Sequence, residues 1–179
     1  TTLFRFIIHA AATKFVDISE REPFEAIDIN VVGSQNIARA ALENKCKIVI
    51  GISTDKAAPP ISNTYALTKS LMERMFCSIN KRSQTRFTNV RFGNIAWSSG
   101  SALPIWTKMA KANGKIQSTG SHMRRYMTTV EEAAQLVIRS FNNIEALQGG
   151  VLIHDMKAVQ ISDLLDVFCE LNNSTWEKI

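Results

Sequence analysis

Residues 47–69 read KIVIGISTDKAAPPISNTYALTK and predict a buried strand, a turn and the start of a helix. The run 47–53 is short, mostly apolar and rich in β-branched residues, which is typical of a strand in a parallel sheet covered on both faces. The dipeptide Pro59-Pro60 favours a turn, and Asn63 or Thr64 can cap a helix that runs to about residue 79. Open α/β sheets bind ligands at the carboxyl ends of their strands, so the polar residues after position 53 lie where a site is expected.

The rest of the chain alternates between predicted strands and helices. Strands are expected at 3–10, 86–92 and 149–155, and helices at 22–44, 104–112, 129–141 and from a cap at Ser162 onward. A short strand pair is expected within 115–128, and the Gly- and Ser-rich segment 93–104 is expected to be a binding loop. This alternation predicts an α/β fold with a Rossmann-like, doubly wound parallel sheet.

Apolar residues at helical spacing predict the buried faces of three helices. The predicted inward residues of the helix over 22–44 are Phe24, Ile27, Val31, Ile37, Ala38, Ala41 and Leu42. Those of the helix after Asn63 are Leu67, Leu71, Met75 and Phe76, and those of the last helix are Leu164, Leu165, Val167, Phe168 and Leu171.

Composition narrows the class of protein. The 179 residues are 45% hydrophobic and 21% charged, as in a soluble globular protein of one domain or slightly more. The 21 Lys and Arg exceed the 16 Asp and Glu, but they are scattered and lack interleaved aromatics, which argues against nucleic-acid binding and favours an anionic small molecule. No apolar run is long enough to span a membrane, and the N-terminus lacks the pattern of a signal peptide. Three distant cysteines argue against a disulfide framework or a metal site and indicate the cytoplasm.

Two groups of residues after position 53 carry chemistry. Tyr65 and Lys69 are four residues apart and share one helical face, so the lysine ammonium is expected to lower the phenol pKa from about 10. Such a phenol can remove a proton from a hydroxyl group of a substrate. Thr54, Asp55 and Lys56 can face one substrate only if the chain turns there, because consecutive strand residues alternate in direction. A half-buried tyrosine and a surface turn with an Asp–Lys pair are the structural alternatives.

The glycine-rich loop of a dinucleotide-binding fold is absent, since neither GxGxxG nor GxxGxxG occurs in the chain. Either the fold does not bind nucleotides, or the first half of it lies outside this sequence. We expect the native polypeptide to extend upstream by roughly one βαβαβ unit.

Several motifs together resemble the extended short-chain dehydrogenase/reductase superfamily. In chain order they are HAAATK (9–14), NVVGSQNIARAA (30–41), STDKA with YALTK (53–57 and 65–69), VRFGNI with SSGSALP (90–95 and 98–104) and MRRYMTTVEEAAQLV (123–137). The Thr-Asp-Lys triplet is similar to that of the branch of inverting UDP-N-acetylglucosamine 4,6-dehydratases and capsular-polysaccharide epimerase-dehydratases. The resemblance covers nearly the whole chain.

The resemblance implies roles for individual residues. The implied catalytic residues are Thr54, Asp55, Lys56, Tyr65 and Lys69. The implied cofactor-binding residues are Ala10, Ala11, Ala12, Asn30, Ser53, Tyr65 and Lys69, and the implied substrate-binding residues are Lys14, Asn94, Ser99, Ser101 and Arg125. His9 is interpreted as structural, and Gly33 is interpreted as allowing close packing against the sheet.

The implied reaction is an NAD- or NADP-dependent dehydration, with NADP slightly favoured by the resemblance. Tyr65 and Thr54 act at the sugar 4-hydroxyl, Lys56 takes the C5 proton and Asp55 protonates the departing 6-hydroxyl. The lysine requires a depressed pKa for this role, which burial near other cations could supply. Residues 1–93 are the implied partial NAD(P)-binding domain with the catalytic residues, and residues 94–179 mainly the nucleotide-sugar region, with some elements returning to the core.

The implied partners are a UDP-sugar substrate and further copies of the chain, without a metal ion. A UDP-sugar C4 or C5 epimerase uses the same residues and stays an alternative. A non-catalytic, dinucleotide-binding regulator on the same fold is a second alternative.

Overall fold

The computed structural model describes residues 5–179, so Leu3 and Phe4 of the predicted strand 3–10 lie outside the described residues. The chain divides into two compact units. Unit 1 comprises the described residues up to Arg91 together with 134–154, and unit 2 comprises Phe92–Ala133 and Asp155–Ile179. The chain therefore leaves unit 1 after the third strand of its main sheet and returns to it for two helices and a strand.

The sheet of unit 1 has four strands in the order β1-β2-β3-β7. They are β1 (Phe6–His9), β2 (Ile48–Thr54), β3 (Arg86–Phe92) and β7 (Val151–Ile153). β1 pairs with β2 in parallel, with Ile7 opposite Val49, and β3 pairs with β7 in parallel, with Val90 opposite Leu152. The predicted strands and the α/β class are confirmed.

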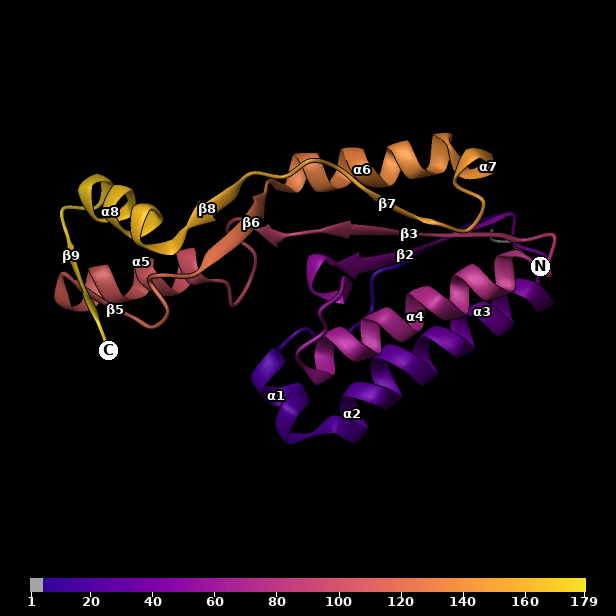
Figure 1. Ribbon diagram of the computed structural model, residues 1–179, viewed down its shortest axis with the longest axis horizontal. Helices are drawn as coiled ribbons and strands as arrows, with labels where there is room; N and C mark the ends of the chain where they lie inside the picture. Colours follow the sequence, from indigo (N-terminus) through magenta and orange to yellow (C-terminus); the bar gives the residue numbers. More distant parts are fainter. Residues whose placement is uncertain (1–4) are drawn as a thin grey trace. The chain divides into compact units, whose positions relative to one another are not determined.

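Helices lie on both faces of this sheet. They are α1 (Val16–Arg21), α2 (Pro23–Ile27), the π-helical turn η1 (Asp28–Val32), α3 (Gly33–Glu43), the 3₁₀ turn η2 (Asp55–Ala57), α4 (Thr64–Asn80), α6 (Val130–Asn142) and α7 (Ile144–Leu147). Figure 1 shows α3 and α4 on one face and α6 on the other. The single helix expected over 22–44 is interrupted by the π turn, whereas α4 begins as predicted, with Asn63 Oδ1 accepting a hydrogen bond from Ala66 N at 2.8 Å.

The core of unit 1 corrects part of the predicted helix faces. Its buried residues are Ala38, Ala41, Cys46, Val49, Met72, Phe76 and Phe87. Phe24 is 82% exposed and Leu67 57% exposed, and Ile27, Leu42 and Leu71 are also exposed. α4 instead buries Lys69 and Glu73 together with Met72 and Phe76. The prediction failed on α4 because hydropathy assigns a lysine and a glutamate to solvent.

Unit 2 contains two small sheets and two helices. One sheet has the order β4-β6-β8 and comprises β4 (Asn94–Ile95), β6 (Arg124–Thr128) and β8 (Ala158–Gln160). The other pairs β5 (Lys115–Ser118) with β9 (Thr175–Lys178) in parallel. The two strands expected around 115–128 are present, but the expectation that they pair with each other is wrong, because they join different sheets.

The helices of unit 2 pack around an aromatic core. α5 (Ala102–Asn113) and α8 (Ile161–Leu171) enclose the buried residues Leu103, Trp106, Ile116, Leu165, Phe168 and Cys169. The N-cap of α8 is Gln160 and not the expected Ser162, and Val167 and Leu171 are exposed.

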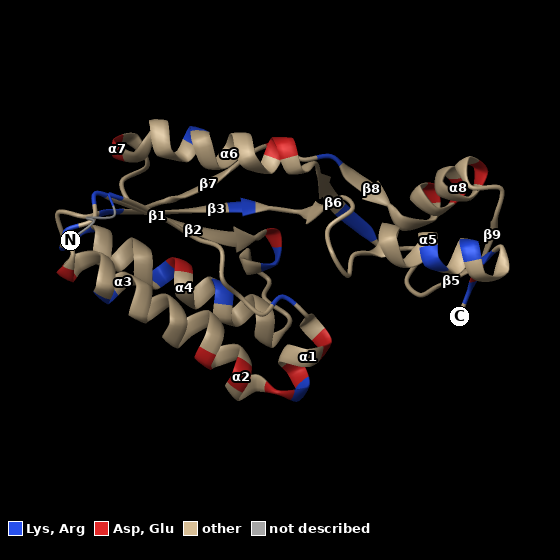
Figure 2. Cartoon of the chain, turned by 180° about the vertical axis from the view of Figure 1, so that it is seen from behind, with Lys and Arg blue, Asp and Glu red and all other residues tan. Residues whose placement is uncertain are grey.

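Helix α6 begins with the predicted reciprocal cap. Thr129 N donates to Glu132 Oε2 at 2.8 Å, and Glu132 N donates to Thr129 Oγ1 at 3.1 Å. Lys and Arg residues are spread over several elements and are interspersed with acidic residues (Figure 2). Among residues 5–179, no helix combines the length and the hydropathy that crossing a membrane requires.

Candidate active site

The carboxyl end of β2 gathers three polar side chains of one short turn. Thr54 is the N-cap of η2, and its Oγ1 donates to Asp55 Oδ1 at 2.9 Å. The ammonium of Lys56 donates to the same carboxylate oxygen at 3.2 Å. The backbone thus turns directly after the strand, which allows three consecutive side chains to share hydrogen bonds.

Tyr65 lies in the first turn of α4 and reaches this cluster, because its phenol is hydrogen-bonded to the side chain of Thr54. Thr54 has one hydroxyl proton and gives it to Asp55, so it must turn that proton toward the phenolate when Tyr65 ionises. The hydrogen bond joins the two residue groups that the sequence separates by the turn at Pro59-Pro60.

The pKa of Tyr65 is raised in the structure, whereas the sequence predicts a lowered pKa. Burial raises the pKa of the phenol above its usual value, the hydrogen bond with Thr54 lowers it, and the charge of Asp55 raises it. Lys69 was expected to lower this pKa, but its Nζ donates to Met72 Sδ at 3.5 Å. In this structure, desolvation therefore decides the protonation of Tyr65.

Lys69 is buried, and its surroundings change the pKa of its ammonium group. It is 2% exposed, and burial lowers its pKa from 10.5 to about 8, against the carboxylate of Glu73, which raises it. Glu73 is held by Arg91, whose Nε and Nη2 donate to the two carboxylate oxygens at 2.7 and 2.6 Å. Arg91 also donates to the carbonyl of Ala57 at 3.3 Å and so ties η2 to α4 and β3.

Asn30 fixes the loop that follows β1. Its Oδ1 accepts from Thr13 N at 3.0 Å, and its Nδ2 donates to Thr13 O at 3.1 Å and to Thr68 Oγ1 at 3.0 Å. Its side chain is fully buried, so any effect of Asn30 on a cofactor would pass through Thr13 and Thr68. The π turn that carries Asn30 is a feature often found at functional sites.

The residues near the carboxyl ends of β1 and β2 fit a dinucleotide cofactor. Ser53 Oγ is buried and has no hydrogen-bond partner, which suits a polar group of a ligand. Ala10, Ala11 and Ala12 are exposed and small, so a ligand can approach the backbone there. Gly33 does not have the predicted role, since an added Cβ would meet only the carbonyl oxygen of Asp28 at 3.5 Å, an ordinary contact.

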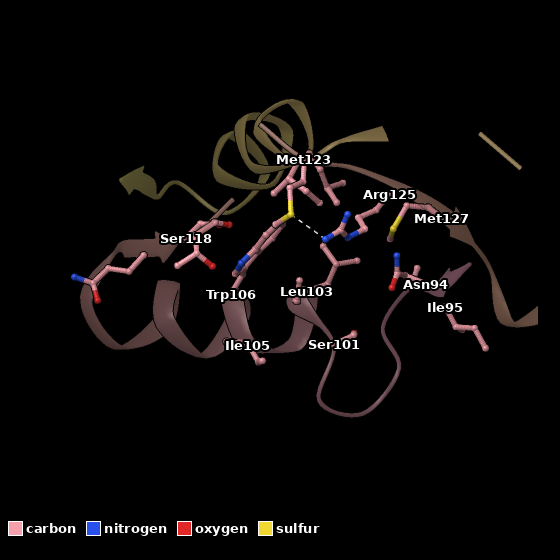
Figure 3. Close-up of a pocket in the computed structure, with 16 residues that line it drawn as sticks. Asn94, Ile95, Ser101, Leu103, Ile105, Trp106, Ser118, Met123, Arg125 and Met127 are labelled. Atoms are coloured by element: carbon pink, nitrogen blue, oxygen red, sulfur yellow. Dashed lines mark hydrogen bonds between the residues drawn. The ribbon is translucent and has the colours of Figure 1, made fainter. Parts of the chain in front are cut away.

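Unit 2 contains a pocket of about 400 Å³, shown in Figure 3. Predicted substrate-binding residues Asn94, Ser101 and Arg125 line it. The Arg125 guanidinium donates to Met123 Sδ at 2.9 Å, and Ser101 Oγ is buried without a partner. The pocket therefore offers a cation and an unsatisfied hydroxyl in a wall that also contains the polar residues Asn94, Gln117, Ser118 and Thr119.

Two predicted substrate-binding residues lie elsewhere. Ser99 is exposed and is not among the residues that line this pocket, and Lys14 is exposed in unit 1, with its Nζ 5.7 Å from the centroid of the Phe15 ring. The sequence motifs do not predict the apolar part of the wall of the unit 2 pocket. It comes from segments distant in sequence and includes Leu103, Trp106, Met123, Met127, Ile161 and Leu164. On α5, the three-residue spacing of Leu103 and Trp106 is a sequence signal for part of this wall.

Comparison with known proteins gives a consistent assignment. Over 164 residues the chain is 37% identical to a UDP-N-acetylglucosamine 4,6-dehydratase (inverting) of Campylobacter jejuni, a match covering 89% of this chain and 48% of that protein. Over 172 residues it is 35% identical to a UDP-glucose 4-epimerase of Rickettsia bellii, covering 94% of this chain and 50% of that protein. The chain spans about half the length of these curated relatives.

A solved structure supports the fold. The X-ray structure of Pen from Bacillus thuringiensis superposes with a TM-score of 0.90 at 35% identity, over 97% of this chain and 56% of that one. The family model described as polysaccharide biosynthesis protein matches residues 2–178. The chain therefore belongs to this family of polysaccharide biosynthesis proteins.

Proposed function

We propose that this chain carries the catalytic residues of an NAD(P)-dependent nucleotide-sugar dehydratase that acts on a UDP-N-acetylhexosamine. The observation that carries the proposal is the hydrogen bond between the Tyr65 phenol and Thr54, directly beside the Asp55–Lys56 ion pair. Unit 1 would supply the chemistry, and the pocket of unit 2 would hold the nucleotide part of the substrate, with Arg125 facing the diphosphate.

The first step is oxidation of the sugar at C4. Because burial raises the pKa of Tyr65, the phenol must first lose its own proton, and the hydroxyl of Thr54 then turns from Asp55 to stabilise the phenolate. The phenolate accepts the proton of the 4-hydroxyl. Ser53, Tyr65 and Lys69 would hold the dinucleotide, with the backbone of Ala10–Ala12 close to it. Bound NAD(P) would supply the hydride acceptor for the oxidation at C4 and the hydride donor for the later reduction at C6.

The second step is loss of water across C5 and C6. The C4 ketone makes the C5 proton acidic, and elimination needs a base at C5 and an acid at the 6-hydroxyl. The Asp55–Lys56 pair can provide both, because moving one proton across 3.2 Å from Nζ to Oδ1 turns the ion pair into a neutral amine and a carboxylic acid. Lys56 then takes the C5 proton, Asp55 protonates the leaving hydroxyl, and water departs. Both members then carry their original charges, and the Lys56 ammonium can return its proton to C5 when the hydride adds to C6.

The chain offers a matched test of the proposal, because it contains two tyrosines. The protein that contains this chain is incubated with NAD(P) and UDP-N-acetylglucosamine, and products are analysed by mass spectrometry. A product lighter by one water is expected. Tyr65→Phe should abolish it, whereas Tyr126→Phe, an exposed position of β6, should not. Equal loss in both variants, or no loss of water by the parent protein, would contradict the proposal.

A UDP-sugar C4 epimerase is the second candidate, favoured by the Rickettsia relative. Epimerisation at C4 needs the Tyr65–Thr54 pair but no elimination, so Asp55→Asn and Lys56→Ala separate the two functions. A dehydratase loses turnover in both variants, whereas a C4 epimerase keeps a product of unchanged mass.

Two further features belong to the proposal. Exposed apolar residues on α2 and α4, among them Phe24 and Leu67, support a homo-oligomer. Sedimentation of the parent protein and of Leu67→Glu tests this, and a parent that sediments as a monomer contradicts it. Cys46, Cys77 and Cys169 form no disulfide within the described part of the chain, which fits a reducing compartment, so the cytoplasm is the proposed location.

A further inference from the structure

A buried chain of hydrogen bonds connects the end of β1 to the first turn of α4. His9 Nε2 lies 2.8 Å from Ser34 Oγ, and Ser34 Oγ lies 2.6 Å from the carbonyl oxygen of Asn30. The amide of Asn30 donates to Thr68 Oγ1, which donates to the carbonyl of Tyr65 at 2.8 Å. All four side chains between β1 and Tyr65 are buried, so water does not substitute for a lost link.

The geometry fixes the donor at each link. The carbonyl of Asn30 can only accept, so the hydroxyl proton of Ser34 is directed to it. Ser34 must then accept from His9, which requires a proton on Nε2 of the imidazole. Burial, and after it the charge of Lys69, lowers the pKa of His9 to about 4, so the ring is neutral near pH 7 and does not add a second cation beside Lys69.

This chain of hydrogen bonds also stabilises the π turn. A π turn leaves the regular helical hydrogen-bond pattern, and here the hydroxyl of Ser34 binds the carbonyl of Asn30 within it. The turn directs the amide of Asn30 to Thr13 and Thr68 together. A loss of the His9–Ser34 bond would free Ser34 to adopt another rotamer and would loosen this bridge.

We propose that His9 is a positioning residue of the active site, which acts through Ser34, Asn30 and Thr68 to hold the first turn of α4 so that the phenol of Tyr65 meets Thr54. This inference rests on the proposed function for its catalytic consequence, but not for its structural one. Nothing in the sequence pattern separates His9 from a purely structural core histidine.

The test measures the pH at which the Tyr65 phenol ionises. In the protein that contains this chain, the ionisation of Tyr65 is followed as the difference in ultraviolet absorbance from a matched Tyr65→Phe protein, in His9→Leu, Ser34→Ala and His9→Gln. The first two variants remove the link, so the phenol should lose its bond with Thr54 and titrate at a higher pH than in the parent. His9→Gln keeps an N–H donor near the position of Nε2 and should titrate like the parent.

The titrations of these variants decide whether His9 positions the phenol of Tyr65. Folded His9→Leu and Ser34→Ala proteins that titrate like the parent would overturn the proposal, as would a His9→Gln protein that behaves like His9→Leu. A phenol that titrates near the free value of about 10 in variants that have lost their circular dichroism would show that His9 only supports folding, which also overturns it.

Turnover separates this inference from the proposed function. In the protein that contains this chain, His9→Leu should lower kcat about tenfold, as expected when an active-site group loses one hydrogen bond, with KM unchanged. His9→Gln should restore kcat. Should the parent show no turnover while the phenol titration still shifts, the proposed function fails and the positioning role stands. Should the parent turn over while His9→Leu changes neither kcat nor the titration, the positioning role fails alone.

Discussion

Acid should destabilise this protein through His9. Its pKa is about 4 in the folded chain against an ordinary value of 6.5, with burial as the first cause. Between these values the unfolded chain binds a proton that the folded chain does not, so stability is complete above pH 6.5 and is lost as the pH falls toward 4. A shift of about 2.5 units corresponds to about 3 kcal/mol in total, of which about 2 kcal/mol is lost between pH 7 and pH 5.

The assay is urea unfolding at pH 7, 6 and 5, with the free energy of unfolding compared between variants. His9→Gln cannot titrate but keeps a donor for Ser34, so it should lose about 2 kcal/mol less than the parent between pH 7 and pH 5. His122→Gln is the matched control, because His122 is exposed in unit 2, and it should lose as much as the parent. If His9→Gln and the parent lose stability in parallel, the burial argument for His9 is wrong.

Three further changes follow from the buried groups of unit 1. Lys69→Met should raise the free energy of unfolding at pH 7 by about 2 kcal/mol while abolishing turnover, because burial lowers the pKa of the ammonium to about 8 and so disfavours its charged form. For the same reason the parent protein should gain stability as the pH rises from 8 to 10.5. A Lys69→Met protein that is less stable than the parent in urea would contradict this reasoning. Arg91→Met should cost about 3 kcal/mol in urea, since it leaves the carboxylate of Glu73 buried without its partner; a change within error would show that the pair contributes little. Gly51→Ala should lower the melting temperature, because an added Cβ would lie 2.9 Å from a ring carbon of Phe76, and an unchanged value would mean that the ring yields freely.

The strands and the position of the site could be predicted from sequence. β1, β2 and β7 are short and mostly apolar runs, which composition indicates, and the carboxyl end of a strand is where parallel sheets bind ligands. The cap of α4 and the reciprocal cap of α6 use local side-chain contacts within three residues, which a sequence pattern can show. Local rules therefore succeed where the stabilising contact is itself local.

The failures have a common physical cause, which is that the deciding contact lies far away in sequence. β5 pairs with β9 about 60 residues later, so the expected pair within 115–128 was wrong. Ser34, which donates a hydrogen bond to the carbonyl of Asn30 in the π turn, also contacts His9, 25 residues away. The pKa of Tyr65 depends on how much of the fold covers the phenol, which spacing along one helix does not report. The spacing of apolar residues along the sequence does not report these distant contacts or the burial of the phenol.

The pattern of misassigned residues on α4 itself carries functional information. A helix chosen only for stability would bury apolar residues, yet α4 buries Lys69 and Glu73 and leaves Leu67 and Leu71 exposed. Burying an ammonium is costly, as the pKa of Lys69 near 8 shows, and a carboxylate needs Arg91 to be tolerated. Sequences break local rules mainly where function requires it. The buried cation four residues after a phenol that reaches Thr54 is therefore better explained by chemistry at β2 than by folding.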